Sequence, residues 1–260
     1  MGIRHAQKLS RMKDVDLVAV CDTNEYRAER LAEEVGCDDA RNYWDLFGDL
    51  DAAVVATNPA THGEICEALL NETIHVLVEK PMATSERQAL SMAEVADTNG
   101  VVLQVGHIER FNPVFNRIKQ VAKVPFQIKA ERYAAPGLRQ FEIDVVLDLM
   151  IHDIDMVLDL AATEVSKITA SGNPDTAIAE LRFVDGSVAV LRADRKAKTR
   201  ERVWTLNDDK HFLIGEYDCL QDELRHFITC IREGRQPDVA GEQGLNALKV
   251  ALEISRQVNA

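Results

Sequence analysis

The segment Ile74-His75-Val76-Leu77-Val78 runs directly into Glu79-Lys80-Pro81. A short apolar run rich in Val and Ile that ends in polar residues is typical of a buried strand in a parallel sheet. Ligands of open α/β sheets bind at the carboxyl ends of the strands, which is where Lys80 would lie. A lysine at a strand end is usually a solvated charge. Because the following proline restricts its backbone and partial burial would favour the neutral amine, Lys80 is a candidate for acid-base chemistry.

Strands and helices alternate over the first hundred residues. Apart from residues 74–78, runs rich in Val and Ala predict strands at residues 16–21, 52–56 and 101–105. Amphipathic helices are predicted between the strands, at residues 3–12, 25–35, 61–70 and 85–98. This alternation predicts a Rossmann-type parallel sheet that is covered by helices on both faces.

The alternation stops after Asn112-Pro113, where we predict that a second domain begins. Strands are predicted at residues 127–133, 167–170, 177–183, 187–193 and 201–206. Neighbouring strands are expected to pair antiparallel, with Asp185-Gly186 as a hairpin turn. Helices are predicted at residues 144–160, 221–231 and 244–258. The chain is therefore expected to be α/β, with a parallel-sheet domain at 1–112 and a mainly antiparallel α/β domain at 113–260.

The predicted helix at residues 144–160 carries a single polar stripe. Its members lie four, four, three and four residues apart on an otherwise apolar helix; they are Asp144, Asp148, His152, Asp155 and Asp159. The stripe is either the solvent-exposed face of a helix packed on a sheet or one wall of an active site, and the spacing leaves both open. In the second case His152 is a general acid or base, oriented by a carboxylate one turn away.

The N-terminus carries part of a dinucleotide-binding signal. The full signal is Gly-x-Gly-x-x-Gly after the first strand, with an acidic residue about 20 positions later. Gly2 stands 20 residues before Asp22, which follows the strand at 16–21. The spacing fits a final fingerprint glycine and a ribose-binding aspartate that repels a 2′-phosphate, so NAD is favoured over NADP. Alone, Gly2 is equally an ordinary second residue and Asp22 an ordinary turn residue.

Three motifs, in this order along the chain, resemble one known family. They are Glu79-Lys80-Pro81, Gly106-His107-Ile108-Glu109-Arg110-Phe111-Asn112-Pro113 and Asp148-x-x-x-His152-x-x-Asp155. The family is that of glucose-fructose oxidoreductase, inositol dehydrogenase and MocA (Gfo/Idh/MocA). The second motif looks most like members that oxidise nucleotide-linked N-acetyl sugars at the 3-position. The resemblance extends to residues 241–248 and implies an NAD-binding domain at 1–112 and a substrate-binding and oligomerisation domain at 113–260.

The resemblance also implies roles for single residues. Lys80 and His152 would be the catalytic pair, and Asp148 would help to place the sugar. The candidate cofactor-binding residues are Gly2, Ile3, Asp22, Thr57, Asn58, Pro59, His62, Glu79, Lys80 and His107. The structural alternatives are a hydrogen bond at a helix start for His62 and packing between the domains for His107. No metal site is predicted.

The expected reaction is hydride transfer from a sugar carbon to NAD while a base takes the hydroxyl proton. The expected substrate is a nucleotide sugar, UDP-N-acetylglucosamine or its uronic acid. One alternative is a dehydrogenase of a free sugar, an inositol or another polyol. Another is a catalytically inactive family member that acts as a binding or assembly protein. A homo-oligomer, dimer or tetramer, is expected to form through the C-terminal sheet.

The resemblance is incomplete at the N-terminus. Family members have a strand and the complete fingerprint before the segment that starts here at Met1. The hypothesis is that Met1 is an internal residue and that the true start lies upstream, which reading the upstream DNA in frame would test. Without that strand, its two neighbours in the sheet would have unpaired edges and NAD affinity would fall. The segment at 194–217 is also shorter than in family members, which affects any substrate contacts made there.

Composition argues against several other functions. With 30 basic and 43 acidic residues, the formal charge of −13 opposes both nucleic acid and anionic membrane surfaces as partners. No apolar run reaches the roughly 18 residues of a membrane span, and no secretion signal is visible. The five cysteines are scattered and include no Cys-x-x-Cys, which indicates neither a disulfide framework nor a zinc site. A cytoplasmic protein with reduced, buried thiols is expected.

Overall fold

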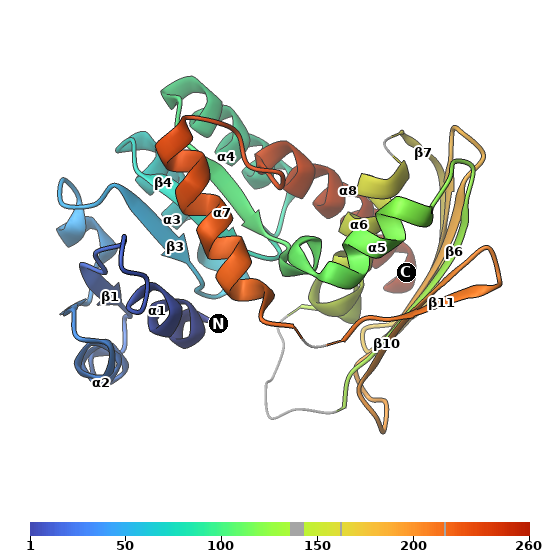
Figure 1. The fold of residues 1–260 in the computed structure, drawn as a ribbon, viewed down its shortest axis with the longest axis horizontal. Helices are drawn as coiled ribbons and strands as arrows, with labels where there is room; N and C mark the ends of the chain where they lie inside the picture. The colour runs from blue at the N-terminus through green and yellow to red at the C-terminus, as the bar shows by residue number, and fades with distance from the viewer. Residues whose placement is uncertain (136–142, 162, 216) are drawn as a thin grey trace. The chain divides into compact units, whose positions relative to one another are not determined.

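The computed structural model describes residues 1–135, 143–161, 163–215 and 217–260. The chain forms two compact units (Figure 1). Unit 1 consists of Met1–Gly106 and Leu220–Glu242, and unit 2 of His107–Cys219 and Gln243–Ala260. The predicted boundary at residue 112 lies six residues later than this division, and the return of the chain to unit 1 was not predicted. The return has a structural reason, because the Val105 N–H donates to the Val239 carbonyl at 2.9 Å and Gln104 bridges to Ala240.

Unit 1 contains two parallel sheets. In the first, β1 (Ala19–Cys21) pairs with β2 (Asp38–Ala40). The second has the order β3-β4-β5, formed by Ala52–Val55, His75–Glu79 and Leu103–Gly106. Three predicted strands are thus confirmed with ends shifted by one or two residues, the strand at 16–21 is shortened, and β2 was missed. β1 and β3 belong to different sheets, so the parallel arrangement is interrupted between them.

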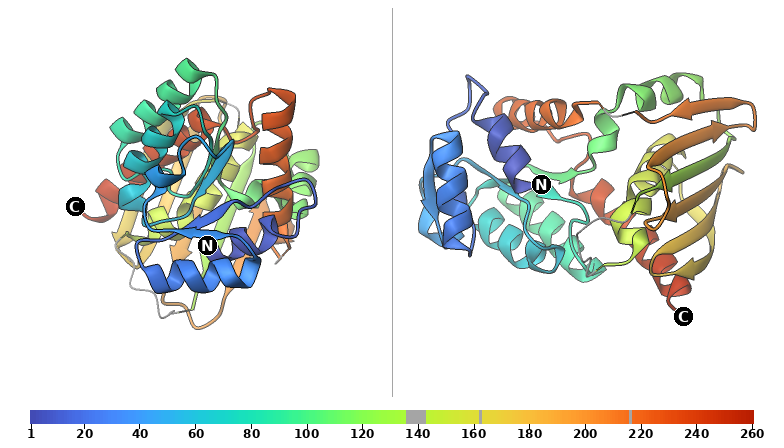
Figure 2. Two further views of the ribbon diagram at one scale, coloured as in Figure 1. Left: turned by 90° about the vertical axis from the view of Figure 1, so that its left-hand side faces the viewer. Right: turned by 90° about the horizontal axis from the view of Figure 1, so that it is seen from below.

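Helices lie on both faces of the β3-β4-β5 sheet, as the alternating pattern predicted. α3 (Pro59–Asn71) and α4 (Glu86–Asn99) cover one face, and α1 (Gly2–Leu9) and α7 (Cys219–Glu233) lie against the other (Figure 2). The central strand β4 is consequently buried on both sides, and Val76, Leu77 and Val78 have no exposed surface. The remaining helix of this unit, α2 (Glu25–Val35), packs on β1 and β2.

Unit 2 is built on a six-stranded sheet with the order β11-β10-β6-β9-β8-β7. In chain order the strands are Gln127–Tyr133, Val165–Asn173, Thr176–Phe183, Val188–Asp194, Glu201–Leu206 and Lys210–Leu213. All neighbours pair antiparallel except β6 and β9, which are parallel. The expectation that sequence neighbours pair is therefore wrong for β6 with β7 and for β9 with β10, since β6 lies between β9 and β10. A helical connection separates β6 from β7, and such a crossover allows β6 to enter the middle of the sheet.

Helices cover one face of this sheet (Figure 1). They are α5 (Pro113–Val121), α6 (Ile151–Ala161) and most of α8 (Gly241–Val258). A 3₁₀ turn (Ile108–Phe111) precedes α5, and a π-helical turn (Val146–Met150) precedes α6. The predicted helix at 144–160 is therefore present but is not a uniform α-helix. Along β6, buried and exposed residues alternate, which gives the sheet one covered and one open face.

The predictions about thiols are only partly correct. Cys66, Cys219 and Cys230 are buried, but Cys21 at the end of β1 is exposed and Cys37 is half-buried. None of the described helices combines the length and the apolar character needed to cross a membrane. Among the described residues, no group of three or more His, Cys, Asp or Glu side chains is arranged to hold a metal ion.

Candidate functional site

In unit 1 the carboxyl ends of β3 and β4 lie side by side. Val55 pairs with Val78 in parallel register, so the turn Thr57-Asn58-Pro59 after β3 and Lys80 after β4 reach the same edge of the sheet. The Lys80 side chain is half-buried. This is the edge at which parallel α/β sheets bind their ligands.

The turn after β3 is organised by the start of α3. The Asn58 side chain is the N-cap and its Oδ1 accepts the Ala60 N–H at 3.0 Å. Pro59 is the first helical residue, where its fixed φ and missing N–H cost nothing. The Thr57 hydroxyl lies 2.9 Å from the Thr61 hydroxyl. The positive end of the α3 dipole is thereby held beside the β3 carboxyl end, an arrangement that suits a polar or anionic ligand.

His62 bridges the segment that follows Lys80 and the turn that follows β3. Its Nδ1 lies 2.9 Å from the Pro81 carbonyl oxygen and its Nε2 lies 3.3 Å from the Thr57 carbonyl oxygen. Burial lowers the pKa of His62, and the hydrogen bonds to these two carbonyls only partly oppose the shift. A neutral imidazole donates to one of the two oxygens at a time. The geometry supports the structural alternative for His62.

Glu79 is held from within unit 1. Its side chain is buried, and its Oε1 lies 2.8 Å from Nε2 of His5 on α1. Burial raises the pKa of Glu79, but the hydrogen bond and charge of His5 together with the charge of Lys80 outweigh it, so the net shift is downward. Glu79 is therefore a carboxylate at neutral pH. His5 could not be recognised as the partner of Glu79 from the sequence, because the two residues are 74 positions apart and leave no local pattern.

The remaining cofactor candidates of unit 1 lie at the start of α1 and after β1. Gly2 is the first residue of α1, and a Cβ added to it would meet no atom within 4 Å. Ile3 is exposed. The Asp22 carboxylate accepts the Asn24 N–H at 2.8 Å and so forms the turn into α2. A helix N-terminus with open space and a carboxylate after β1 fit the pyrophosphate and ribose of a dinucleotide.

The candidates of unit 2 lie around α6. Asp148 is buried in the π-helical turn, and His152 is half-buried in the first turn of α6. His107 precedes the 3₁₀ turn and is 1 % exposed. The π-helical pattern adds a residue to the turn and breaks the uniform spacing on which the predicted stripe was based. Such turns occur often at functional sites, which fits the place of Asp148.

The C-terminal half of the stripe forms a structural ion pair. Arg110 donates to both oxygens of Asp155, at 2.6 and 2.9 Å, and its Nη1 lies 2.5 Å from Asp159. Lys119 donates to the other Asp159 oxygen at 2.7 Å. Asp155 is 1 % exposed, so these oxygens do not face solvent. The interpretation of the stripe as a solvent-exposed face is therefore wrong for Asp155, and the other interpretation, one wall of an active site, stays a prediction.

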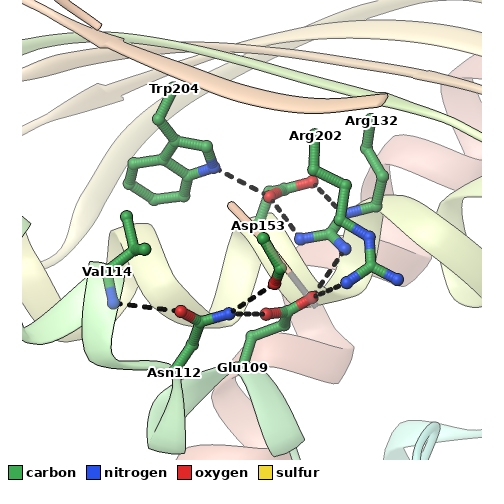
Figure 3. A network of polar contacts seen from close by, with 8 residues as sticks. Glu109, Asn112, Val114, Arg132, Asp153, Arg202 and Trp204 are labelled. Atoms are coloured by element: carbon green, nitrogen blue, oxygen red, sulfur yellow. Dashed lines mark hydrogen bonds and ion pairs between the residues drawn. The ribbon is translucent and has the colours of Figure 1, made fainter. Parts of the chain in front are cut away.

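Unit 2 contains a second group of charges, largely buried, that was not predicted from the sequence (Figure 3). Its charged members come from the 3₁₀ turn, β6, α6 and β10; they are Glu109, Arg132, Asp153 and Arg202. Trp204 donates its indole N–H to Asp153 at 2.9 Å. Asp153 lies next to the predicted stripe and not on it, so helical spacing gave no signal for it.

A parallel sheet with a lysine at its carboxyl edge and a capped helix beside it has the arrangement in which α/β folds of the dinucleotide-binding class bind their ligands. Consistent with this, the model of the oxidoreductase family with an NAD-binding Rossmann fold, GFO_IDH_MocA, matches residues 1–107. UDP-N-acetylglucosamine 3-dehydrogenase of Acidithiobacillus ferrooxidans is 28% identical over 298 residues, which cover 100% of this chain and 95% of the relative. Myo-inositol dehydrogenase Hyg17 of Streptomyces leeuwenhoekii is 30% identical over 218 residues, covering 75% and 67%.

A solved structure leads to the same assignment. UDP-N-acetylglucosamine 3-dehydrogenase GnnA from Acidithiobacillus ferrooxidans superposes with a TM-score of 0.91 at 28% identity, covering 98% of this chain and 93% of that one. The chain belongs to the Gfo/Idh/MocA oxidoreductase family. It is an NAD-dependent dehydrogenase that acts on CH–OH groups, which confirms the predicted fold class, cofactor and enzyme class.

Proposed function

We propose that this dehydrogenase oxidises a nucleotide sugar, UDP-N-acetylglucosamine or its uronic acid, at the 3-position. The observation that carries the proposal is the 28% identity to UDP-N-acetylglucosamine 3-dehydrogenase, which extends over 100% of this chain. The lysine at the carboxyl end of β4 and the histidine at the start of α6 supply acid-base groups for such a reaction.

NAD, when bound, accepts the hydride from the sugar carbon. In unit 1, the N-terminus of α1 at Gly2 and Ile3 would hold the pyrophosphate, and Asp22 would accept a hydrogen bond from the adenosine ribose. The turn Thr57-Asn58-Pro59 and Lys80 would line the nicotinamide side. The roles of Glu79, His62 and His107 would be indirect, because each side chain is largely buried.

The proton chemistry falls to Lys80 and His152. A hydroxyl that loses a hydride also releases its proton, and either the Lys80 amine or the His152 imidazole can accept it. Asp148, buried one turn before His152, would help to place the sugar. The pH dependence of kcat/KM in Lys80→Ala and His152→Ala assigns the base, because the variant that lacks it loses the corresponding limb of the profile.

A substrate panel followed by NADH absorbance tests the proposal. The value of kcat/KM for UDP-N-acetylglucosamine is expected to exceed that for free N-acetylglucosamine by about two orders of magnitude, because the nucleotide supplies binding energy remote from the reacting carbon. Faster turnover of myo- or scyllo-inositol would favour the second candidate, an inositol dehydrogenase, which the 30% identity to Hyg17 supports. No turnover of any of these, together with no heat on titration with NAD, would favour the inactive family member.

We also propose that the chain forms a homo-oligomer through the open face of its six-stranded sheet. On this face Ile178 of β8 is 44 % exposed and pairs with Arg192 of β9. An apolar side chain among charged neighbours suits a self-complementary interface. Light scattering after size exclusion should give a dimer or tetramer, and Ile178→Glu should shift it to the monomer. A monomeric wild type at micromolar concentration would contradict the proposal.

A further inference from the structure

Four buried side chains of unit 2 and one half-buried side chain, Arg202, form one connected group around the start of α6. They are Glu109, Arg132, Asp153, Arg202 and Trp204 (Figure 3). We infer that this group, the positioning network, fixes the helix that carries His152 and thereby sets the geometry of the sugar side of the reaction. For its kinetic consequence this inference rests on the proposed function.

The central contact of the positioning network joins β6 to α6. Arg132 donates through Nε and Nη2 to the two oxygens of Asp153, at 2.7 and 2.8 Å. Trp204 of β10 donates to Asp153 from another direction, at 2.9 Å. A bidentate pair constrains the orientation of both side chains, and the third donor removes the remaining freedom of the carboxylate. Asp153 follows His152 directly, so the backbone of His152 is held with it.

The other end of the positioning network joins the 3₁₀ turn and α5. Glu109 accepts from Arg132 at 3.0 Å and from Arg202 at 2.8 Å through the same oxygen. Its second oxygen accepts from the Asn112 side-chain N–H at 3.0 Å, and Oδ1 of the same amide accepts the Val114 N–H and so caps α5. The segment at 107–112 and the start of α6 are therefore both attached to β6 through Arg132.

The charges of the positioning network balance, and all of its charged members except Arg202 are buried. Two carboxylates face two guanidinium groups, and Glu109, Arg132 and Asp153 are each less than 5 % exposed. Burial raises the pKa of Glu109, but the charges of Arg132 and Arg202 outweigh it, so the carboxyl stays ionised. Buried ion pairs add little net stability, whereas breaking one leaves an uncompensated charge. Such a group therefore favours one arrangement of its elements over others.

Helix α6 is held from two directions. Asp153 is bound by Arg132 and Trp204 from the sheet, whereas Asp155 is bound by Arg110 from the 3₁₀ turn. Two residues along an α-helix correspond to about 200° around its axis. Rotation or sliding of α6 would break one set of bonds or the other. Because a displacement of about 1 Å can lower a rate by about 100-fold, this restraint bears directly on His152.

Two substitutions loosen the positioning network to different degrees. Trp204→Phe removes one donor, and Asp153→Asn removes the charge that Arg132 binds. We expect kcat to fall by about tenfold in Trp204→Phe and by about 100-fold in Asp153→Asn. The Kd for NAD should stay within about twofold, because the proposed cofactor residues other than His107 lie in unit 1. Steady-state kinetics and calorimetry measure both quantities.

The matched control is Phe126→Leu. Phe126 is a fully buried aromatic residue that directly precedes β6, at the opposite end from Arg132. Its truncation destabilises the same sheet without touching the positioning network, so its kcat should stay within about twofold of the wild type. Equal losses of kcat in Phe126→Leu and Trp204→Phe would reduce the network to a purely structural role and overturn the inference.

Failure of the proposed function can be told apart from failure of this inference. If the wild type turns over none of the sugars, the proposed function fails, and the NMR signals of the His152 ring still report its position. Trp204→Phe and Asp153→Asn should shift those signals and leave the ring signals of His226, in unit 1, unchanged. Unshifted His152 signals in both variants would overturn the inference whatever the activity.

Discussion

Lys80→Ala is expected to lose about 10²- to 10⁴-fold in kcat, the range for removal of a general acid or base, while its Kd for NAD changes by no more than a few-fold. Lys80 follows β4, whose residues Val76, Leu77 and Val78 are fully buried and fix the position of the main chain. The side chain contributes a proton acceptor or donor to the reaction. It is only one of several proposed cofactor-binding groups at the carboxyl edge of the sheet, so its loss should weaken NAD binding little. Initial rates by NADH absorbance and calorimetry with NAD separate the two effects.

Lys123→Ala is the control for the Lys80 variant. Lys123 is an exposed lysine between α5 and β6 with no assigned role, so its removal changes the net charge equally and should leave kcat unchanged. A near-normal kcat in Lys80→Ala would show that the strand-end lysine is only a solvated charge. Loss of NAD binding together with kcat would instead give Lys80 a role in holding the cofactor.

The elements predicted correctly are those with local signals at both ends. α2 begins after the cap Asn24 and ends at Gly36, which has a φ of 78°. By contrast, β2 has the sequence Asp-Asp-Ala, and only its pairing with β1 makes it a strand. α5 was missed because Asn112-Pro113 was interpreted as a domain boundary, although a capping residue before a proline is also a helix start.

The last hairpin of unit 2 had a signal that was not used. Asn207 and Asp208, between β10 and β11, both adopt positive φ angles, of 53° and 60°. Asn and Asp tolerate this conformation better than most residues and are favoured in hairpin turns. Adjacent Asn and Asp after the strand at 201–206 are therefore a hairpin signal, from which β11 could have been predicted.

The sequence predicts only those features of the candidate site that follow from adjacent residues. The place of Lys80 after a strand follows from the adjacent residues, and the structure has it there. The partners of the helical carboxylates do not follow from spacing, because Arg110 and Arg132 lie 45 and 21 residues from the aspartates that they bind. Spacing therefore grouped Asp155 with His152 and overlooked Asp153.

Long-range packing also hides a buried acid in unit 1. Glu223 of α7 is 0 % exposed, and neither of its carboxyl oxygens has a hydrogen-bond partner among the described residues. Its backbone carbonyl accepts from the Gln104 amide at 3.2 Å, which places it over β5. Burial, and to a lesser degree the charge of Glu79, raises the pKa of Glu223 well above its ordinary value. Burial therefore favours the neutral, protonated form of Glu223 in the folded protein more than in the unfolded chain.

This shift makes the stability of unit 1 fall as the pH rises. Above the ordinary pKa of about 4.5 the unfolded chain releases the Glu223 proton, whereas the folded chain keeps it up to its raised pKa. Between these two pKa values, each rise in pH lowers the free energy of unfolding further. Glu223→Leu should raise the free energy of unfolding by about 1–3 kcal/mol at pH 7, the range for removing a buried polar group without a partner. Its advantage over the wild type should grow as the pH rises above about 5, up to the raised pKa of the folded state, measured by urea unfolding.

Two further variants separate the titration from the burial. Glu223→Gln does not titrate but keeps a buried polar group, so its advantage should also grow with pH while remaining smaller than that of Glu223→Leu. Glu94→Gln, at an exposed position on α4 of the same unit, should change neither the stability nor its pH dependence. If Glu223 were instead an ion-paired carboxylate, both of its variants would be less stable than the wild type, and the difference would increase above pH 5.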